Sequence, residues 1–450
     1  MRAILHHPDA GILSAAAGLL AVALLAGMAQ PAVFAVALAG AVAAGLLFLA
    51  FSFPTKATVL WLLITGMSLE MTLHDLIGDA AFQPTIAVVK GTGLVLAGVC
   101  ALRFGIRTDM LNPAWAFLAI FLAGLTEGLH PGLTVMDSLR SAIGSVAPFM
   151  FAFCRLPRDW PSSVLRAVRW CPVVAVGASL PLGLAGVRPI FIDSGGLRLA
   201  GLGHPAFLAS VCLPAVYACL IALCQSGRRG DLALLAVNAT ILLLTGARAP
   251  LAYAAAVSGI SLATIRSAAF SARIRLSLLL GCAALLPVAL LLAGDLSDIR
   301  VFNLFGGHEA TNLSGRNLLW PAFEHAARSA PWFGWGLGAG NLVIPSTGPI
   351  ARELHTWAAH NEYLRLSVEG GALGRLLLVG LFVGWVLVHT RTLGAAERRI
   401  MRLAFLAVAA HAVTDNLLIS TPACVMFAFA TAVFADGKAR LTLPDSAPLA

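Results

Sequence analysis

The chain consists largely of long apolar runs rich in Ala, Leu, Val and Gly, separated by short polar connections. A helix needs about 20 consecutive apolar residues to cross a bilayer, whereas the strands of a membrane barrel alternate apolar and polar positions. The pattern therefore predicts an all-α, polytopic membrane bundle of about 12 to 14 transmembrane helices. The predicted spans are 11–29, 31–51, 57–73, 85–102, 111–126, 139–153, 171–186, 205–225, 231–246, 249–265, 275–293, 373–390, 400–414 and 421–436.

Several of these runs are shorter than a full span, so twelve spans with additional re-entrant pieces are an alternative. Residues 11–29 could also form a secretory signal peptide. We favour an uncleaved first span, because a second apolar run follows at once.

Two blocks of spans, 1–293 and 373–437, flank one long polar segment at 294–372, and a polar tail follows at 438–450. Within the long segment, the stretch SGRNLLWPAFEHAARSAP starts with a serine N-cap, Ser314, followed by apolar residues at helical spacing. This pattern predicts an amphipathic helix on the membrane face, with its tryptophan, Trp320, at the interface. The next stretch, WFGWGLGAG, is typical of a turn that lets the backbone approach a ligand or another helix closely.

The stretch AAHNEYLRLSVEGG, at 358–371, gathers more polar side chains than the apolar runs around it. Good helix formers followed by two glycines predict a helix over 358–369 that ends at a Gly370–Gly371 C-cap. In such a helix His360 would share a face with Tyr363.

The composition also indicates a membrane protein, because 59% of the residues are hydrophobic and 11% are charged. Soluble domains carry about 25% charged residues. The net charge of +9 could indicate a nucleic-acid partner, but topology explains it better, and we expect no nucleic acid. The eight Cys lie within or beside apolar runs and form no CxxC pattern, so we interpret them as small buried hydrophobic residues.

The basic residues give the orientation of the chain. With the N-terminus in the cytoplasm, most Lys and Arg fall in cytoplasmic loops, as the positive-inside rule requires. We therefore expect both termini to be cytoplasmic and residues 294–372 to lie outside. Charges left on the outer side are informative, because intramembrane charges are usually paired or functional, and a cluster of cations suggests a bound anion. The outer cations are Arg188, Arg198, Arg248, Arg300, Arg316, Arg328, Arg352, Arg365 and, near the outer ends of spans, Lys90, Arg140 and Arg375.

Four residues have the clearest candidate chemistry: His360, Arg198, Arg248 and Arg316. An imidazole suits proton removal near neutral pH, so His360 is a candidate general base; the alternative is a hydrogen-bonded structural histidine. The three arginines come from distant segments, each beside a glycine or a tight turn. They could converge on phosphate, whose oxygens a guanidinium binds in a bidentate fork, or they could reach lipid head groups.

Other polar residues could support such a site. Glu362 and Glu369 are better explained as salt-bridge partners of Arg365 and Arg352 than as acid–base groups. Asp415 could bind a hydroxylated ligand or cap a helix. The supporting candidates are Lys90, His204, Asn361, Glu362, Asp415 and Asn416.

The sequence favours chemistry without a metal or a nucleotide. His355 and His360 are five residues apart and cannot share a helix face, and no HExxH, Walker A, GxSxG or outer DxD motif occurs. We therefore expect no metal site and no cofactor.

Four motifs, taken in order, resemble the O-antigen ligase and polymerase superfamily of bacterial envelopes. They are RLAGLGHPAFLA, TGARAP, SGRNLLWPAFEHAARSAPWFGWGLG and HNEYLRLSVEGGALG, with TDN near the C-terminus in support. The motifs cover residues 198–416, and the hydropathy profile extends the likeness to the whole chain.

The resemblance implies a membrane glycosyltransferase of the bacterial inner membrane with a periplasmic active site. Such an enzyme would move a saccharide from undecaprenyl diphosphate to a sugar hydroxyl on a glycan or lipid A core acceptor, with inversion and without a metal. His360 would accept the proton of the acceptor hydroxyl. Arg198, Arg248 and Arg316 would hold the diphosphate and stabilise the charge that develops on it.

Two positions depart from the family pattern: Ala247 stands where Ser usually precedes the arginine, and Ala206 where Asn often follows His-Pro. Both changes affect hydrogen bonds near the site and leave the proposed charges in place. Ligases and polymerases share the motifs; ligase-type transfer is slightly favoured, with O-antigen or exopolysaccharide polymerisation and protein O-glycosylation as alternatives. Other polysaccharide assembly proteins are possible partners.

Two other classes of protein fit the hydropathy profile. A transporter or flippase of lipid-linked sugars predicts ionisable residues near the bilayer midplane and internal repeats, and the sequence has neither feature. A non-catalytic scaffold of an export complex predicts that His360→Ala leaves glycan assembly intact.

Overall fold

The computed structural model describes most of the chain between residues 45 and 442. The described residues are 45, 47–77, 79–193, 196–264, 316–354 and 356–442. The predicted spans at 11–29 and 275–293, most of the span at 31–51, Ser314, His355 and the tail from residue 443 lie outside them. The chain divides into two compact units, Met1–Thr58 and Val59–Ala450. In the first unit, the helix α3 (Pro54–Met67) begins, and the Thr58 hydroxyl donates a hydrogen bond to the Pro54 carbonyl at 2.8 Å.

Most of the described residues are helical and very few lie in strands, which confirms the all-α class. After α3 the helices are α4 (Leu69–Ile77), α5 (Asp79–Phe104), α6 (Ala114–Glu127), α7 (Val135–Val146), α8 (Trp160–Leu184), α9 (Pro205–Ser226), α10 (Arg229–Leu244), α11 (Arg248–Thr264), α13 (Arg316–Ser329), α14 (Pro349–Leu354), α15 (Glu362–His389), α16 (Ala395–His411) and α17 (Pro422–Thr442). Three short 3-10 helices are η1 (Ala147–Phe153), η3 (Ala339–Asn341) and η4 (Thr390–Thr392). Strands β1 (Phe191–Asp193) and β2 (Leu197–Leu199) pair as an antiparallel hairpin.

Among the described residues, five helical segments are long and apolar enough to cross a bilayer: Pro84–Phe104, Trp160–Leu184, Pro205–Ser226, Glu362–Thr392 and Pro422–Leu441. The chain is therefore a multi-pass membrane protein. Several other predicted spans are shorter helices, such as α6 with 14 residues. The total of about 12 to 14 spans stays a prediction.

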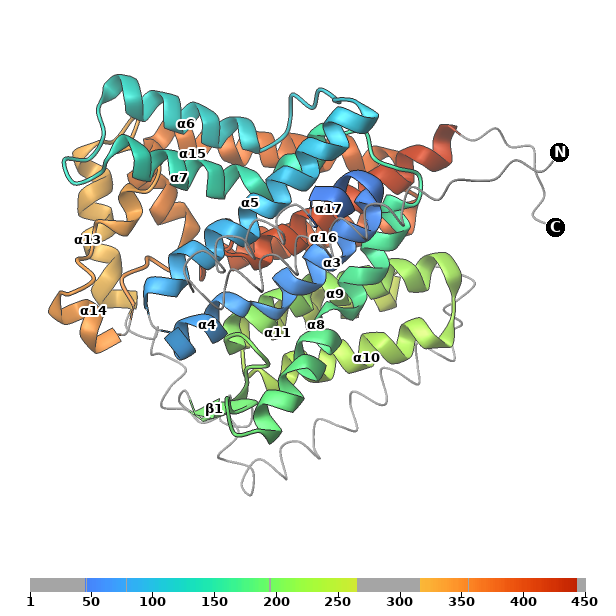
Figure 1. Cartoon of the computed structure of the whole chain (residues 1–450). Helices are drawn as coiled ribbons and strands as arrows, with labels where there is room; N and C mark the ends of the chain where they lie inside the picture. The colour runs from blue at the N-terminus through green and yellow to red at the C-terminus, as the bar shows by residue number, and fades with distance from the viewer. Residues whose placement is uncertain are drawn as a thin grey trace, which may run out of the picture. The chain divides into compact units, whose positions relative to one another are not determined.

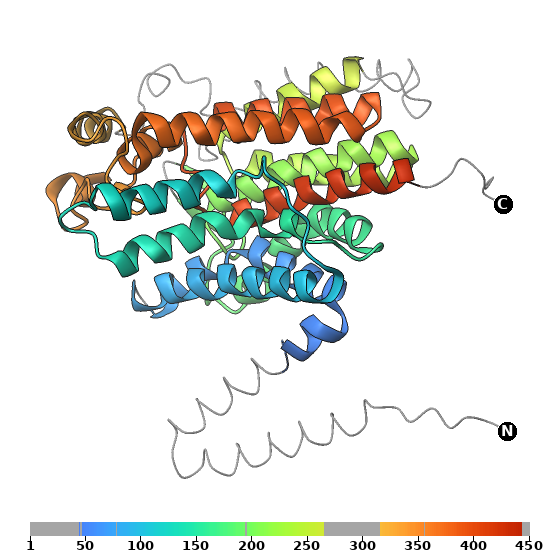
Figure 2. The same ribbon diagram turned by 90° about the horizontal axis from the view of Figure 1, so that it is seen from above.

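Within the second unit, α9 and α17 form the centre of the bundle and α15 lies at its side (Figures 1 and 2). The apolar windows of α9 and α17 are 83% and 78% buried, whereas that of α15 is only 28% buried. Exposed side chains on α15, including Leu376 and Val383, are large and apolar. They suit contact with lipid tails, so the bundle presents an apolar surface where the sequence predicts a membrane.

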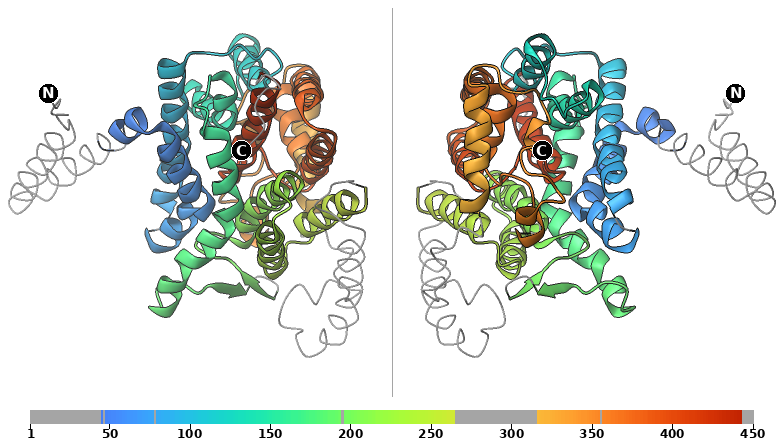
Figure 3. Two further views of the ribbon diagram at one scale, coloured as in Figure 1. Left: turned by 90° about the vertical axis from the view of Figure 1, so that its right-hand side faces the viewer. Right: turned by 90° about the vertical axis from the view of Figure 1, so that its left-hand side faces the viewer.

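Helices α13 and α14 gather at the end of the bundle where α15 begins (Figures 1 and 3). Leu319 and Phe323 of α13 are fully buried against Ala359, Val368 and their neighbours, which together form a small separate core. The indole N–H of Trp320 donates to the Ala359 carbonyl at 2.9 Å. The apolar side of α13 thus packs on protein, and its place on the membrane face with Trp320 at the interface stays a prediction.

Helix α15 differs from the prediction at both ends of the stretch 358–371. It begins at Glu362, with Asn361 as N-cap, and it continues to His389. The glycine pair bends the helix instead of ending it, because Gly371 has φ 58° and ψ −159° inside α15. A Cβ at this glycine would lie 2.4 Å from the carbonyl carbon of Trp332, so the close backbone contact and the positive φ both require glycine.

Candidate active site

His360 lies immediately before α15, in the turn that leads into the helix. The Asn361 side chain accepts a hydrogen bond from the Leu364 N–H at 3.1 Å and so caps the helix. The prediction that His360 sits on a helix face beside Tyr363 is wrong, because Asn361 is a far better N-cap than the alanine at 358. His360 has φ 45°, a left-handed conformation that costs a residue with a Cβ on the order of 1–3 kcal/mol. Such strain is concentrated at functional sites.

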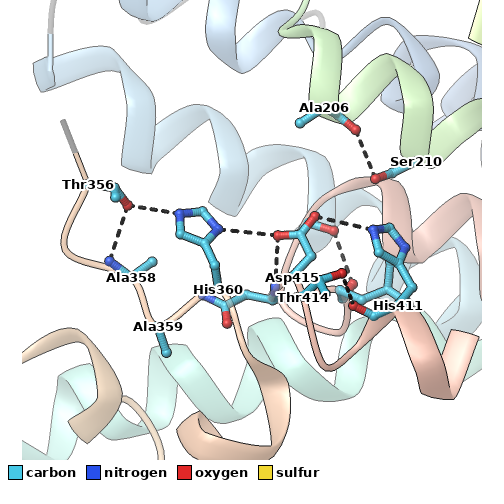
Figure 4. A network of polar contacts seen from close by, with 12 residues as sticks. Ala206, Ser210, Thr356, Ala358, Ala359, His360, His411, Thr414 and Asp415 are labelled. Carbon is cyan, nitrogen blue, oxygen red and sulfur yellow. Dashed lines mark hydrogen bonds and ion pairs between the residues drawn. The ribbon is translucent and has the colours of Figure 1, made fainter. Parts of the chain in front are cut away.

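Both nitrogens of the His360 ring have partners. Nε2 lies 3.0 Å from the Thr356 hydroxyl, and Nδ1 lies 3.4 Å from a carboxylate oxygen of Asp415. Thr356, His360, Asp415 and His411 follow one another in a row (Figure 4). His360 is 35% exposed and Asp415 is 31% exposed. The pair is therefore held by protein contacts and still accessible to a substrate.

Asp415 is ionised at neutral pH, and this fixes the proton positions on His360. Burial opposes the charge of Asp415, but the hydrogen bond from His360, the charges of His411 and His360, and the Asn416 N–H outweigh it and lower the pKa of Asp415. An ionised carboxylate can only accept hydrogen bonds. Nδ1 of His360 must therefore carry a hydrogen, so that in the neutral imidazole Nε2 has the lone pair that accepts from the Thr356 hydroxyl.

His411 and Thr356 contribute to the site although the sequence motifs do not predict them. His411 is buried at the end of α16 with its Nε2 3.7 Å from Asp415, and its ring lies 5.6 Å from that of Tyr253. The spacing of four residues between His411 and Asp415 is a signal that the sequence does contain, since such residues meet on one helix face. Thr356 has no comparable sequence signal.

Arg316, the first residue of α13, lies close enough to Asp415 for their charges to interact. Burial lowers the pKa of Arg316, and the Asp415 carboxylate opposes that shift. The side chain stays protonated, because guanidinium pKa values exceed about 12. One of the three predicted arginines thus lies within electrostatic range of Asp415, the partner of His360.

Arg198 lies against the turn that precedes Arg248. Arg198, on strand β2, donates through Nε to the Thr245 carbonyl at 2.7 Å, three residues before Arg248 begins α11. Tyr253 lies about 7.5 Å further along that helix and contacts His411. Helix α11 therefore connects the turn that Arg198 contacts to His411 of the site.

His204 and Lys90, two supporting candidates, have positioning roles. His204 caps α9, with its Nδ1 accepting from the Ala206 N–H at 3.2 Å. Lys90 donates to the Ile419 carbonyl at 2.6 Å and to the Gly144 carbonyl at 3.1 Å. The first of these bonds holds the α16–α17 loop, which carries Asp415.

Glu362 forms a buried ion-pair network with Arg365 and Glu369. Arg365 donates to both carboxylates, and the three side chains are at most 4% exposed. The salt-bridge interpretation of Glu362 and Glu369 is confirmed for Arg365. Glu362 also fixes the site through its backbone N–H, which donates to the Ala412 carbonyl at 2.7 Å. Asn416 donates its N–H to Asp415 at 2.8 Å.

The described cysteines are free thiols, and all except the half-buried Cys224 are buried, which confirms their interpretation as small hydrophobic residues. Within the described ranges, no group of three His, Cys, Asp or Glu side chains is arranged to hold a metal ion.

If His360 acts as a general base, Asp415→Asn should lower the catalytic rate at least about tenfold with little change in KM, because an amide can donate to Nδ1 and favour the wrong His360 tautomer. Initial rates over a range of substrate concentrations test this. The low pKa of Asp415 means that its charge stabilises the fold above the ordinary carboxyl pKa of about 3.9, and this contribution is lost as the pH falls through the lower folded value. The stability difference between wild type and variant should therefore shrink in acid. An unchanged rate in Asp415→Asn would remove this residue from the mechanism.

Residues 233–379 match the family model described as O-antigen ligase, from α10 to the middle of α15. This segment, about a third of the chain, is similar to the O-antigen ligase family. The matched segment includes Arg248, Arg316 and His360, whereas Arg198 and Asp415 lie outside it. No curated protein matches the chain. The match supports a membrane enzyme of the ligase or polymerase type, which transfers glycosyl groups.

Proposed function

We propose that this protein transfers a saccharide from undecaprenyl diphosphate to a sugar hydroxyl at the periplasmic face of the bacterial inner membrane, with both termini in the cytoplasm. The observation that carries the proposal is the His360–Asp415 pair beside Arg316. Asp415 holds the partly exposed ring of His360 in one tautomer, and Arg316 adds a permanent positive charge near Asp415. A base and an anion-binding group are what glycosyl transfer from a diphosphate requires.

The proposed reaction begins when the acceptor hydroxyl replaces the Thr356 hydroxyl at Nε2 of His360. The imidazole takes the proton as the acceptor oxygen forms a bond to the anomeric carbon. The bond from that carbon to the diphosphate oxygen breaks, and its electron pair leaves with undecaprenyl diphosphate. Asp415 stabilises the imidazolium, and Arg198, Arg248 and Arg316 stabilise the leaving group. Attack from the face opposite the diphosphate gives inversion.

Purified protein in nanodiscs, supplied with a lipid-linked saccharide and an acceptor glycan, tests the proposal directly. A new glycosidic bond of inverted configuration supports it, and addition of EDTA should leave the rate unchanged. Movement of the lipid-linked sugar without bond formation would instead indicate a flippase. Strong inhibition by EDTA would indicate a metal-dependent reaction.

Within this reaction class we favour a ligase that uses a lipid A core acceptor. The alternative is a polymerase of O-antigen or exopolysaccharide, because both types share the motifs. A deletion strain distinguishes them: undecorated lipid A core indicates a ligase, and single repeat units left on the lipid indicate a polymerase.

Arg198→Ala and Arg316→Ala should each lower kcat by about 10²–10³-fold, as loss of one donor to a developing oxyanion does. Lysine at either position should restore little, because an ammonium group cannot form the bidentate fork. Arg328→Ala is the matched control for the second variant, since Arg328 is exposed at the far end of α13 and donates to the Glu324 carbonyl of the same helix. Full activity of Arg316→Ala in well-folded protein would contradict the proposed phosphate site.

A further inference from the structure

The helix ends opposite the candidate active site enclose a groove. It has a volume of about 750 Å³ and lies between α8, the end of α9 and the start of α10. Helix α10 separates the groove from the candidate active site. The helix starts at the groove, and its other end leads into Thr245, the hydrogen-bond partner of Arg198. A helix of this length spans about 24 Å. The groove is therefore a separate site.

Two cations at the mouth of the groove have no acidic partner within the described part of the chain. Arg166 of α8 and Arg228, which precedes α10, are both exposed and line the groove. The third arginine of the lining, Arg169, is ion-paired with Asp231. The other oxygen of Asp231 accepts from the Ser226 hydroxyl at 2.6 Å. Since Asp231 is thus occupied, the groove keeps a net positive charge.

The groove changes from basic to apolar along both helices. On α8, Trp170 follows Arg166 by four residues, and on α10, Val237 follows Arg228 by nine. Trp170 is 47% exposed and Val237 is 44% exposed, and both line the groove. Cations at a helix end beside an exposed apolar surface fit a molecule with an anionic head and a hydrocarbon tail.

We propose that this groove binds an anionic phospholipid of the cytoplasmic leaflet. Arg166 and Arg228 hold the phosphate of the head group, and one acyl chain lies along Trp170 and Val237. Inorganic phosphate shares the head-group chemistry but gains nothing from the apolar part of the groove, so the lipid is the better occupant. The inference is independent of the proposed transfer reaction and of the site around His360, but the choice of the cytoplasmic leaflet rests on the proposed orientation of the chain.

Binding of phosphatidylglycerol to the purified full-length chain tests the proposal. We expect wild-type protein to bind short-chain phosphatidylglycerol and to ignore phosphatidylcholine. The double variant Arg166→Gln/Arg228→Gln should bind about tenfold more weakly, because each cation near an anionic surface adds substantially to affinity. Arg158→Gln, an exposed arginine that does not line the groove, is the matched control and should bind as wild type does. The two single variants show the same trend if the double variant proves less stable.

Two further measurements distinguish the sources of the phosphate. Trp170→Ala should weaken binding of phosphatidylglycerol but leave any binding of inorganic phosphate unchanged. Competition by inorganic phosphate as strong as competition by the lipid would overturn the proposal in favour of a soluble anion. Equal binding of phosphatidylglycerol to wild type and to the double variant would overturn it altogether.

Discussion

His360→Asn should lower kcat by about 10²–10⁴-fold while donor binding changes little, because the variant loses the base that removes the acceptor proton. Asparagine is the informative replacement, since it tolerates positive φ better than most residues and so suits the backbone at φ 45°. Its amide is polar but does not accept a proton near neutral pH. The measurement is the steady-state rate of glycosidic bond formation in nanodiscs, with the donor and the acceptor varied separately.

A second histidine provides the control for this experiment. His325 is exposed on α13, and His325→Asn should leave both kcat and KM unchanged. Thermal unfolding of the two variants shows whether either has lost its fold. If His360→Asn keeps more than about a tenth of the wild-type rate, a general base worth 10²–10⁴-fold cannot be assigned to His360.

Sequence patterns predict the features that depend on residues close together in the chain, such as helices and ion pairs within one helix. The apolar runs predict the helices, because a bilayer allows few other structures. The pairing of Arg365 with Glu362 and Glu369 also follows from their spacing of three and four residues. The helix over 316–329 is predicted by its apolar spacing, whereas its apolar face packs on distant segments that the spacing does not reveal.

The candidate site depends on contacts between residues that are far apart in the sequence, and sequence patterns do not reveal such contacts. Asp415 and His360 are 55 residues apart in the chain, and their contact arises because the α16–α17 loop folds back onto the start of α15. The hydrogen bond from Lys90 to the same loop joins residues 329 positions apart. A motif can identify such residues as candidates, but only the packing of α5, α15 and α16 shows which of them are in contact.

Arg365→Met should reduce stability by about 3–5 kcal/mol, because removal of one member of a buried ion-pair network leaves uncompensated charge. Arg365 is 4% exposed, and its partners Glu362 and Glu369 are 1% and 2% exposed. Glu369 also accepts from the N–H groups of Gly338 and Gly340. The variant therefore weakens the contact between α15 and the Gly-rich turn that contains Gly338 and Gly340.

Thermal unfolding of Arg365→Met in detergent micelles measures this effect, and Arg352→Met is the control because Arg352 is an exposed arginine of α14. Glu362→Gln/Arg365→Met/Glu369→Gln should recover part of the lost stability, since neutral side chains leave no buried charge unpaired. If Arg365→Met unfolds at the same temperature as Arg352→Met, the network does not hold α15 in place. In that case the ion-pair network of Arg365, Glu362 and Glu369 would not be what positions His360 at the start of α15.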